Sequence, residues 1–392
     1  MAPLLETVDL VTNFYTYEGV VKALNRISLV VDHGTTFGLV GESGCGKSVT
    51  ARSVMRIVQE PGRIEGGKVV VYLDEKNKET GVDLLEQSEV YMEALRGDQI
   101  SMIFQEPNAA LNPTMSIGDQ VSESYLFHQR QEMNAKILGD LCSPACRAFY
   151  PLKKVQQALY RVAVRDPDAL GLKILDRIPL GKLWQKRLKR EAKRRSIDIV
   201  GKLGIPHPER IVEQYPHSLS GGMKQRIVIA IALACSPVLL IADEATSNLD
   251  VTIQAQILEL LRQLKHEVIS SILLITHDLG IVAETCDRVA VMYAGNLVEV
   301  ADVNDLFKKP LHPYTQALLE AVPKFSMEGT LKSIEGNVPN LVTPPPGCRF
   351  HPRCPHAMEV CTRSFPEMIE IGRNHRVACH LFERVDGKNS RA

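Results

Sequence analysis

A glycine-rich stretch at residues 41–48 carries the clearest chemistry in the sequence. It consists of Gly-Glu-Ser-Gly-Cys-Gly-Lys-Ser, the pattern G-x-x-x-x-G-K-[ST] that is typical of nucleotide-phosphate loops. Glycines let successive backbone N–H groups surround phosphate oxygens, Lys47 can reach the β- and γ-phosphates, and the Ser48 hydroxyl can bind Mg²⁺. The nucleotide-contacting positions that we expect are Gly41, Ser43, Gly44, Cys45, Gly46, Lys47, Ser48 and Val49.

Such a loop needs a strand before it and a helix after it. The apolar run 37–40 suits a buried strand, and residues 49–58 predict a helix whose N-terminus faces the phosphates. Strands are also predicted at 4–11, 28–31, 68–73 and 99–104, and a hairpin at 292–302 with Gly295-Asn296 at its turn.

Two further strand ends carry polar side chains suited to phosphate chemistry. The apolar run 238–242 predicts a buried strand that ends in Asp243 and Glu244. Asp243 suits a Mg²⁺ ligand, and Glu244 is then placed to act as general base on the attacking water. His277 directly follows the predicted strand 272–276, where its imidazole can hydrogen-bond the γ-phosphate and align the water with Glu244.

A second anion site is predicted where Ser220, Gly221 and Gly222 open a helix over 227–234. A chain with one phosphate loop has little need of a second γ-phosphate site on the same nucleotide. The simplest arrangement is a head-to-tail dimer, in which each Ser-Gly-Gly turn caps the nucleotide of the other subunit.

Three positions have weaker signals. Gln105 follows a predicted strand and can contact Mg²⁺ or the attacking water, or be an ordinary surface glutamine. Tyr17 can stack on an adenine ring, a role for which Tyr15 and Phe14 compete, or pack within its own sheet. Asp250 closes a polar turn, 247–250, and is included among the expected nucleotide contacts.

Composition limits the class of protein. The 392 residues contain 46 Lys plus Arg and 46 Asp plus Glu, so no net charge favours nucleic acid. The sequence shows no signal peptide and no apolar run long enough to span a membrane.

Residues 113–216 are rich in helix formers, and 181–195 carry eight basic residues against one acid. That stretch is either a solvated helical face or a contact for anionic lipid or an acidic partner.

The ordered motifs resemble those of the ATP-binding cassette (ABC) ATPases over roughly residues 4–305. The resemblance implies an α/β fold with a RecA-like parallel-sheet core, an antiparallel β-subdomain, a helical subdomain and a small cysteine-rich C-terminal extension. The implied divisions are 1–112 and 218–305 for the nucleotide-binding core, 113–217 for the helical subdomain, and 306–392 for the extension. Residues 129–193 are expected to be an insertion, and Asn248 replaces the usual alanine.

A narrower resemblance is to the oligopeptide/dipeptide importers. It lies in Gly41–Gly44, Ile103–Pro107, Leu111–Pro113, Tyr215–His217, Thr246–Thr252 and His312–Thr315. It implies an ATPase at the cytoplasmic face of the cell membrane, bound to two transmembrane permease subunits and served by an extracellular substrate-binding protein. The second cassette is then a paralogous ATPase or another copy of this chain, and the transported solute stays open.

Four cysteines follow a proline-rich linker: Cys348, Cys354, Cys361 and Cys379. Their wide spacing lacks the close pair usual in zinc sites and favours a [4Fe–4S] cluster, with zinc or metal-free thiols as alternatives. Some of the dipeptide importer ATPases that this tail resembles hold such a cluster. The neighbouring Arg349, His351, Arg353 and Arg363 are expected to serve only the local fold.

Two other functions fit part of the pattern: a soluble ABC ATPase acting on DNA or ribosomes, and a redox-sensing regulatory ATPase. The first usually needs two cassettes or long coiled coils, and neither is visible. The presence of both Glu244 and His277 argues against a purely regulatory role.

Overall fold

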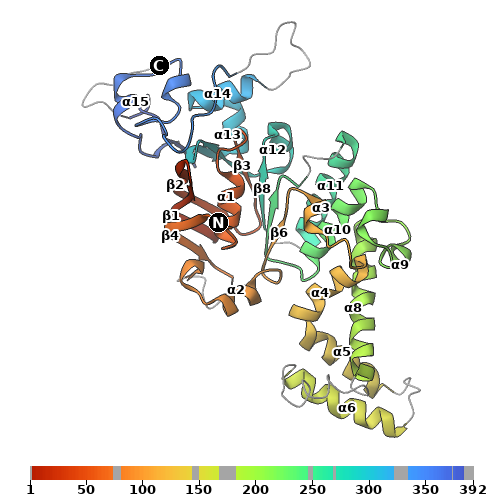
Figure 1. The fold of residues 1–392 in the computed structure, drawn as a ribbon. Helices are drawn as coiled ribbons and strands as arrows, with labels where there is room; N and C mark the ends of the chain where they lie inside the picture. Colours follow the sequence, from red (N-terminus) through yellow and green to blue (C-terminus); the bar gives the residue numbers. More distant parts are fainter. Residues whose placement is uncertain are drawn as a thin grey trace. The chain divides into compact units, whose positions relative to one another are not determined.

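The computed structural model describes residues 2–73, 81–143, 150–166, 182–245, 250–267, 271–321, 334–372 and 374–383. The chain divides into two compact units (Figure 1). The first unit comprises Met1–Glu93, Val238–Ser247 and Leu261–Ala392, and the second comprises Ala94–Pro237 and Asn248–Leu260.

An antiparallel sheet opens the first unit. Its strands, in the order β2-β1-β4-β5, are β2 (Gly19–Asp32), β1 (Pro3–Thr16), β4 (Gly62–Val71) and β5 (Val82–Asp83). Leu5 pairs with Val31 on one side and Val71 on the other, and all three side chains are buried. The predicted β-subdomain is confirmed, and its first two strands extend beyond their apolar parts as one long hairpin.

The core sheet of the first unit is built on buried parallel strands. β3 (Thr36–Val40) pairs in parallel with β8 (Ser271–Thr276) and β9 (Arg288–Tyr293), and β8 pairs in parallel with β7 (Leu239–Asp243). Every residue of β3, β7 and β8 is buried, which agrees with their mostly apolar sequences. The carboxyl ends of these three strands therefore meet at one edge, where doubly wound sheets bind ligands.

The core sheet continues into the C-terminal segment, which we define as residues 334–383. β10 (Asn296–Asp302) forms the predicted hairpin with β9 and also pairs with β12 (His375–Val377), which pairs with β11 (Ile369–Gly372). Phe350 is buried in this segment, and its ring lies 5.1 Å from that of Tyr293 and 5.4 Å from that of Tyr314. The extension thus shares the core of the first unit.

The helices of the first unit are short. They are α1 (Lys47–Val54), α2 (Glu89–Leu95, which ends in the second unit), α12 (Leu279–Thr285), α13 (Val303–Lys308), α14 (Pro313–Glu320) and α15 (Glu359–Arg363), with 3₁₀ turns at Leu84–Glu86 and His351–Arg353. Helix α1 begins two residues before its predicted start and ends four residues before its predicted end. Arg56 has a φ of 50°, a left-handed conformation that a helix does not continue through.

The second unit is mainly helical, as predicted. Its elements are β6 (Ile100–Ile103), α3 (Pro107–Ala110), α4 (Ile117–His128), α5 (Arg130–Cys142), α6 (Tyr150–Arg165), α8 (Lys182–Lys202), α9 (Pro208–Ile211), a 3₁₀ turn at Pro216–Ser218, α10 (Gly221–Leu233) and α11 (Val251–Glu267), which reaches the first unit. The described part of the predicted insertion forms α5, α6 and the start of α8. The boundaries 113 and 217 stay predictions.

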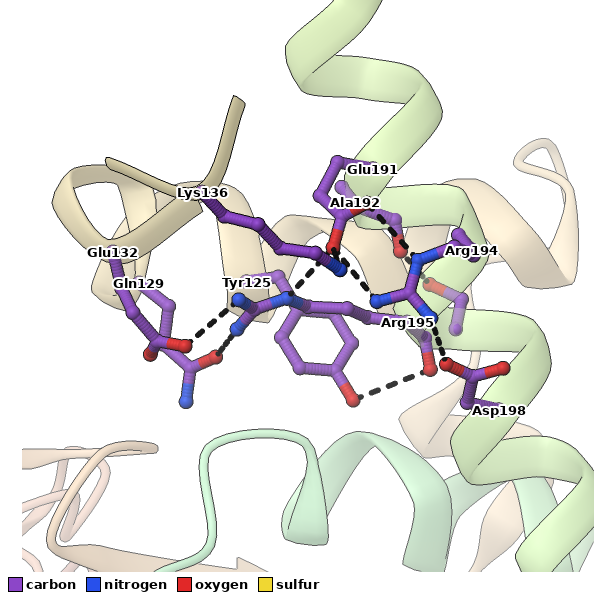
Figure 2. Close-up of polar contacts among 10 residues, drawn as sticks. Tyr125, Gln129, Glu132, Lys136, Glu191, Ala192, Arg194, Arg195 and Asp198 are labelled. Carbon is purple, nitrogen blue, oxygen red and sulfur yellow. Dashed lines mark hydrogen bonds and ion pairs between the residues drawn. The ribbon is translucent and has the colours of Figure 1, made fainter. Parts of the chain in front are cut away.

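Ion pairs join the helices of this unit around Glu191 (Figure 2). Glu191 on α8 accepts hydrogen bonds from Lys136 on α5 at 2.6 Å and from Arg194 at 2.8 Å. Arg195 donates to Glu132 at 2.8 Å. The hydrogen bond from Arg194 is the main cause that lowers the pKa of Glu191 to about 2, against the opposing effect of burial. Part of the basic stretch 181–195 is therefore neutralised within its own unit.

Candidate functional site

The glycine-rich loop lies between β3 and α1, as the sequence predicts. Gly41 and Gly46 have φ values of 155° and 108°. A Cβ atom at Gly41 would lie 2.1 Å from the carbonyl oxygen of Met292, and one at Gly46 would lie 2.7 Å from that of Ala23. Glycine is needed at both positions because the loop is pressed against its neighbours and adopts a backbone that other residues disfavour.

Lys47 and Ser48 begin helix α1 with their side chains at the loop. The Lys47 ammonium is buried and donates hydrogen bonds to the carbonyl oxygens of Gly41 at 2.8 Å and Glu42 at 3.0 Å. The Ser48 hydroxyl donates to the Asp243 carboxylate, at the end of β7, at 2.8 Å. Two residues 195 positions apart thus place adjacent oxygen atoms, the donor set that Mg²⁺ prefers.

Asp243 lies in a partly desolvated position. Burial is the main cause that raises the pKa of its carboxyl group, and the hydrogen bond from Ser48 acts in the opposite direction. A bound divalent cation would favour the ionised form, so the chemistry of this pair fits a metal ligand.

Glu244 and His277 follow β7 and β8 and meet at the same edge of the sheet. The Nδ1 atom of His277 lies 3.5 Å from Oε1 of Glu244. The backbone N–H of Glu244 donates to the carbonyl oxygen of Ile275 at 2.9 Å, and its φ of 46° turns the chain sharply out of β7. The Glu244 side chain is 12% exposed and that of His277 is 53% exposed. Glu244 is therefore largely shielded from solvent, whereas His277 is accessible.

Cys45 and Gly44 belong to the loop itself, and Tyr17 lies in the turn between β1 and β2. Cys45 is buried, and burial raises the pKa of its thiol, so it serves packing rather than reaction. Gly44 has open space around it, whereas Tyr17 is 98% exposed in the β1–β2 turn. That exposure leaves the Tyr17 ring accessible and rules out the alternative that it packs within its own sheet.

The remaining predicted residues belong to the second unit. Ser220 caps α10 by accepting a hydrogen bond from the Met223 N–H at 3.4 Å, and Gly221 and Gly222 are the first two residues of that helix. Gln105 is exposed just after β6. Asp250 caps α11 through the N–H groups of Thr252 and Ile253, whereas residues 246–249 of the predicted turn lie outside the described residues.

Two arginines of the C-terminal segment contact the rest of the first unit, and the prediction that they serve only the local fold is wrong. Arg353 does not serve only the local fold: it donates to the Glu42 carboxylate in the phosphate loop at 2.8 Å, across 311 positions of sequence. Arg349 donates to the carbonyl oxygens of Ala294 and, at 3.2 Å, Lys22. No local pattern signals these contacts, because arginines beside cysteines are equally compatible with partners in their own segment.

The four C-terminal cysteines are free thiols that influence one another. Burial is the main cause that raises the pKa of Cys379 to about 12, and charge on Cys348, Cys354 and Cys361 raises it further. Four cysteines are the donor set of a [4Fe–4S] cluster. However, within the described parts of the chain no group of three or more His, Cys, Asp or Glu side chains is placed to hold a metal ion. The predicted iron–sulfur site therefore gains no support from the geometry.

A phosphate loop, an acidic strand end and a histidine at one edge of a parallel sheet, with a Ser-Gly-Gly helix start elsewhere, define an ATP-binding cassette. The family model described as "ABC transporter" matches residues 24–247, and "Oligopeptide/dipeptide transporter, C-terminal region" matches 298–361. The chain belongs to the ABC transporter family of ATPases. Among the helices in the described ranges, none is long and apolar enough to cross a membrane.

Similar proteins cover nearly the whole chain. The dipeptide transport ATP-binding protein DppD of Bacillus subtilis is 39% identical over 383 residues, which cover 97% of this chain and 95% of that protein. The oligopeptide transport ATP-binding protein OppD of Salmonella typhimurium is 39% identical over 372 residues, covering 94% and 92%. A solved dimer of the cassette MJ0796 bound to ADP and Pi has a TM-score of 0.54 and 18% identity, covering 76% of this chain and 99% of that chain. This last likeness concerns the fold alone.

Proposed function

We propose that this chain is the ATP-hydrolysing subunit of a membrane importer for oligopeptides, dipeptides or related solutes. The observation that carries the ATPase part is the meeting of Lys47, Ser48, Asp243, Glu244 and His277 at one edge of the sheet. Peptide import is supported by the printed functions of the relatives and by the matched C-terminal region.

The residues have separate roles in this proposal. The loop N–H groups and Lys47 hold the phosphates of ATP, with Val49 behind them on α1, while Tyr17 stacks on the adenine. Ser48 and Asp243 would hold Mg²⁺, with Gln105 as a further proposed ligand, and the ion would supply positive charge to offset that of the phosphates. Glu244 takes a proton from the attacking water, and His277 holds Glu244 and the γ-phosphate in line.

A second cassette completes the site. Ser220, Gly221 and Gly222 of the partner subunit cap the γ-phosphate, with Asp250 lying across the same interface. The helix dipole at the start of α10 favours an anion there. The partner is a paralogous ATPase or a second copy of this chain. Closing and reopening of the pair drive two permease subunits at the cytoplasmic face of the membrane, with an extracellular binding protein supplying the solute.

The test is to purify the chain with its membrane partners and measure ATP turnover in the presence and absence of peptide-loaded binding protein. We expect two multi-span permeases to co-purify and loaded binding protein to stimulate turnover. Lys47→Ala should abolish turnover because the phosphates lose their positive partner. Purification with ribosomes or DNA instead of permeases would contradict the importer and favour a soluble ABC ATPase.

We also propose that Cys348, Cys354, Cys361 and Cys379 hold a structural [4Fe–4S] cluster. The support is their number and their spacing in the sequence. Protein purified without oxygen should then contain about four irons and four labile sulfides per chain, and Cys361→Ser should lose them. Stoichiometric zinc, or no metal in an anaerobic preparation, would refute this cluster.

A further inference from the structure

Arg353 of the C-terminal segment binds the side chain of Glu42 in the phosphate loop. Its guanidinium donates to both carboxylate oxygens, at 2.8 and 3.2 Å. The Arg353 side chain is only 6% exposed and that of Glu42 is 24% exposed. A shielded, two-pronged contact of this kind is stronger than an exposed ion pair because water competes less for the charges.

The position of Arg353 is fixed by its own segment and by the core. It donates to the carbonyl oxygens of Glu335 at 2.9 Å and Ile334 at 3.3 Å. It also donates to the Tyr293 hydroxyl at 3.3 Å, and its guanidinium lies 5.8 Å from the centre of that ring. With its other donors engaged in this way, the guanidinium is held in place by groups of the protein itself.

Glu42 is held at three points. Its N–H donates to the Tyr314 hydroxyl at 3.0 Å, and its carbonyl oxygen accepts a hydrogen bond from Lys47 at 3.0 Å. Its carboxylate is the group that Arg353 binds. The residue that carries a negative charge within the phosphate loop is therefore tied to the residue that meets the phosphates.

A carboxylate in this loop opposes nucleotide binding, because the triphosphate is itself strongly negative. Unpaired, Glu42 would repel the phosphates that Lys47 and the loop N–H groups attract. Arg353 supplies the compensating charge from outside the loop.

We propose that Arg353 is a positioning residue for ATP binding: it neutralises and holds Glu42 so that the phosphate loop accepts the triphosphate. The C-terminal segment then regulates nucleotide affinity directly, besides any role in assembly. This inference rests on the proposed function in one respect only, that the loop binds ATP.

The experiment uses the full chain and measures the Kd for Mg²⁺–ATP together with KM and kcat. Arg353→Ala should raise Kd and KM by at least about fivefold, the lower end of typical coupling between sites, while kcat changes little. Glu42→Gln introduced into the same variant should restore affinity toward that of the parent, because it removes the charge that Arg353 neutralised.

Arg363→Ala is the matched control. Arg363 belongs to the same segment and pairs with Glu359, but both side chains are more than 70% exposed, at 73% and 77%. Its removal should leave Kd unchanged. Limited proteolysis of each variant shows whether the C-terminal segment remains folded.

The outcomes separate the two proposals. If the parent fails to bind ATP, the proposed function falls and the inference falls with it. If the parent binds ATP and Arg353→Ala matches it, only the inference falls. If affinity drops but Glu42→Gln does not restore it, Arg353 has a merely structural role and charge neutralisation is wrong.

Discussion

Two arginine-rich regions of this chain use their charges differently. In the C-terminal segment, Arg349 is buried and the Arg353 side chain is only 6% exposed; they contact Lys22 and Glu42, at separations of 327 and 311 positions. In helix α8, Arg194 is 49% exposed and pairs with Glu191 and Asp198 on its own helix (Figure 2). The first region contacts the phosphate loop through Arg353, whereas the second joins helices within its own unit.

The difference shows that burial and partner, rather than the number of basic residues, decide what a charged stretch does. The stretch 181–195 has the higher charge density, yet part of its charge is neutralised locally. The C-terminal segment has fewer basic residues, but a single one of them reaches the phosphate loop. Substitutions in each of the two regions test this difference.

The largest effect is expected from Glu244→Gln. The amide has nearly the same shape but cannot accept the proton, so hydrolysis should fall by roughly 10²–10⁴-fold while ATP binding is retained. Glu191→Gln in the helical unit is the control, and it should leave ATP turnover per folded protein unchanged. Single-turnover hydrolysis in the assembled complex measures both, and parental turnover in Glu244→Gln would show that another residue is the base.

Removal of the His375 side chain should destabilise the first unit. His375 Nε2 lies 2.8 Å from the carboxylate of Glu299, which is fully buried and also accepts from the N–H groups of Leu311 and His312. His375→Ala leaves that carboxylate one partner short and should lower the free energy of unfolding by about 1–3 kcal/mol. Urea unfolding measures this, and an unchanged midpoint would show that β12 is weakly coupled to the core.

Acidification should weaken the same region through His312. Burial is the main cause that lowers the pKa of His312 to about 4, against the opposing charge of Glu299. The unfolded chain then binds the extra proton first, so stability is complete above the ordinary pKa of about 6.5 and falls as the pH drops from there toward 4. His312→Gln should flatten this part of the stability profile, and an unaltered slope would assign it to another group.

The smallest effect is expected in the helical unit. Lys136 and Glu191 form a pair in which Lys136 is 40% exposed, so Lys136→Ala should change stability by about 0–1 kcal/mol. Because the pKa of Glu191 is lowered to about 2, the contribution of this network should persist to mild acid and be lost between about pH 4.5 and 2. Thermal unfolding at pH 7 and pH 3 tests both statements. If Lys136→Ala lowered the free energy of unfolding as much as His375→Ala, the two regions would not differ in how strongly their ion pairs stabilise the fold.

Local patterns were sufficient to predict the phosphate loop and the strand ends that lie beside it in the first unit. The phosphate loop depends on glycine spacing within eight residues. Buried parallel strands can be recognised in a sequence as short apolar runs. The placement of Asp243, Glu244 and His277 followed from one rule, that parallel strands end at the same edge. The contacts of Ser48 with Asp243 and of His277 with Glu244 lie where that rule puts them.

The order of the motifs and the class of sheet could be predicted from the sequence alone, as could the residues proposed to meet the phosphates, because each depends on neighbours a few positions away. Only the tertiary structure decided that β12 joins the core sheet and that Arg353 belongs with Glu42. A partner 311 residues distant leaves no periodicity to detect. Phe350 packs against Tyr293 and Tyr314, and this packing positions the C-terminal segment so that Arg353 lies beside Glu42.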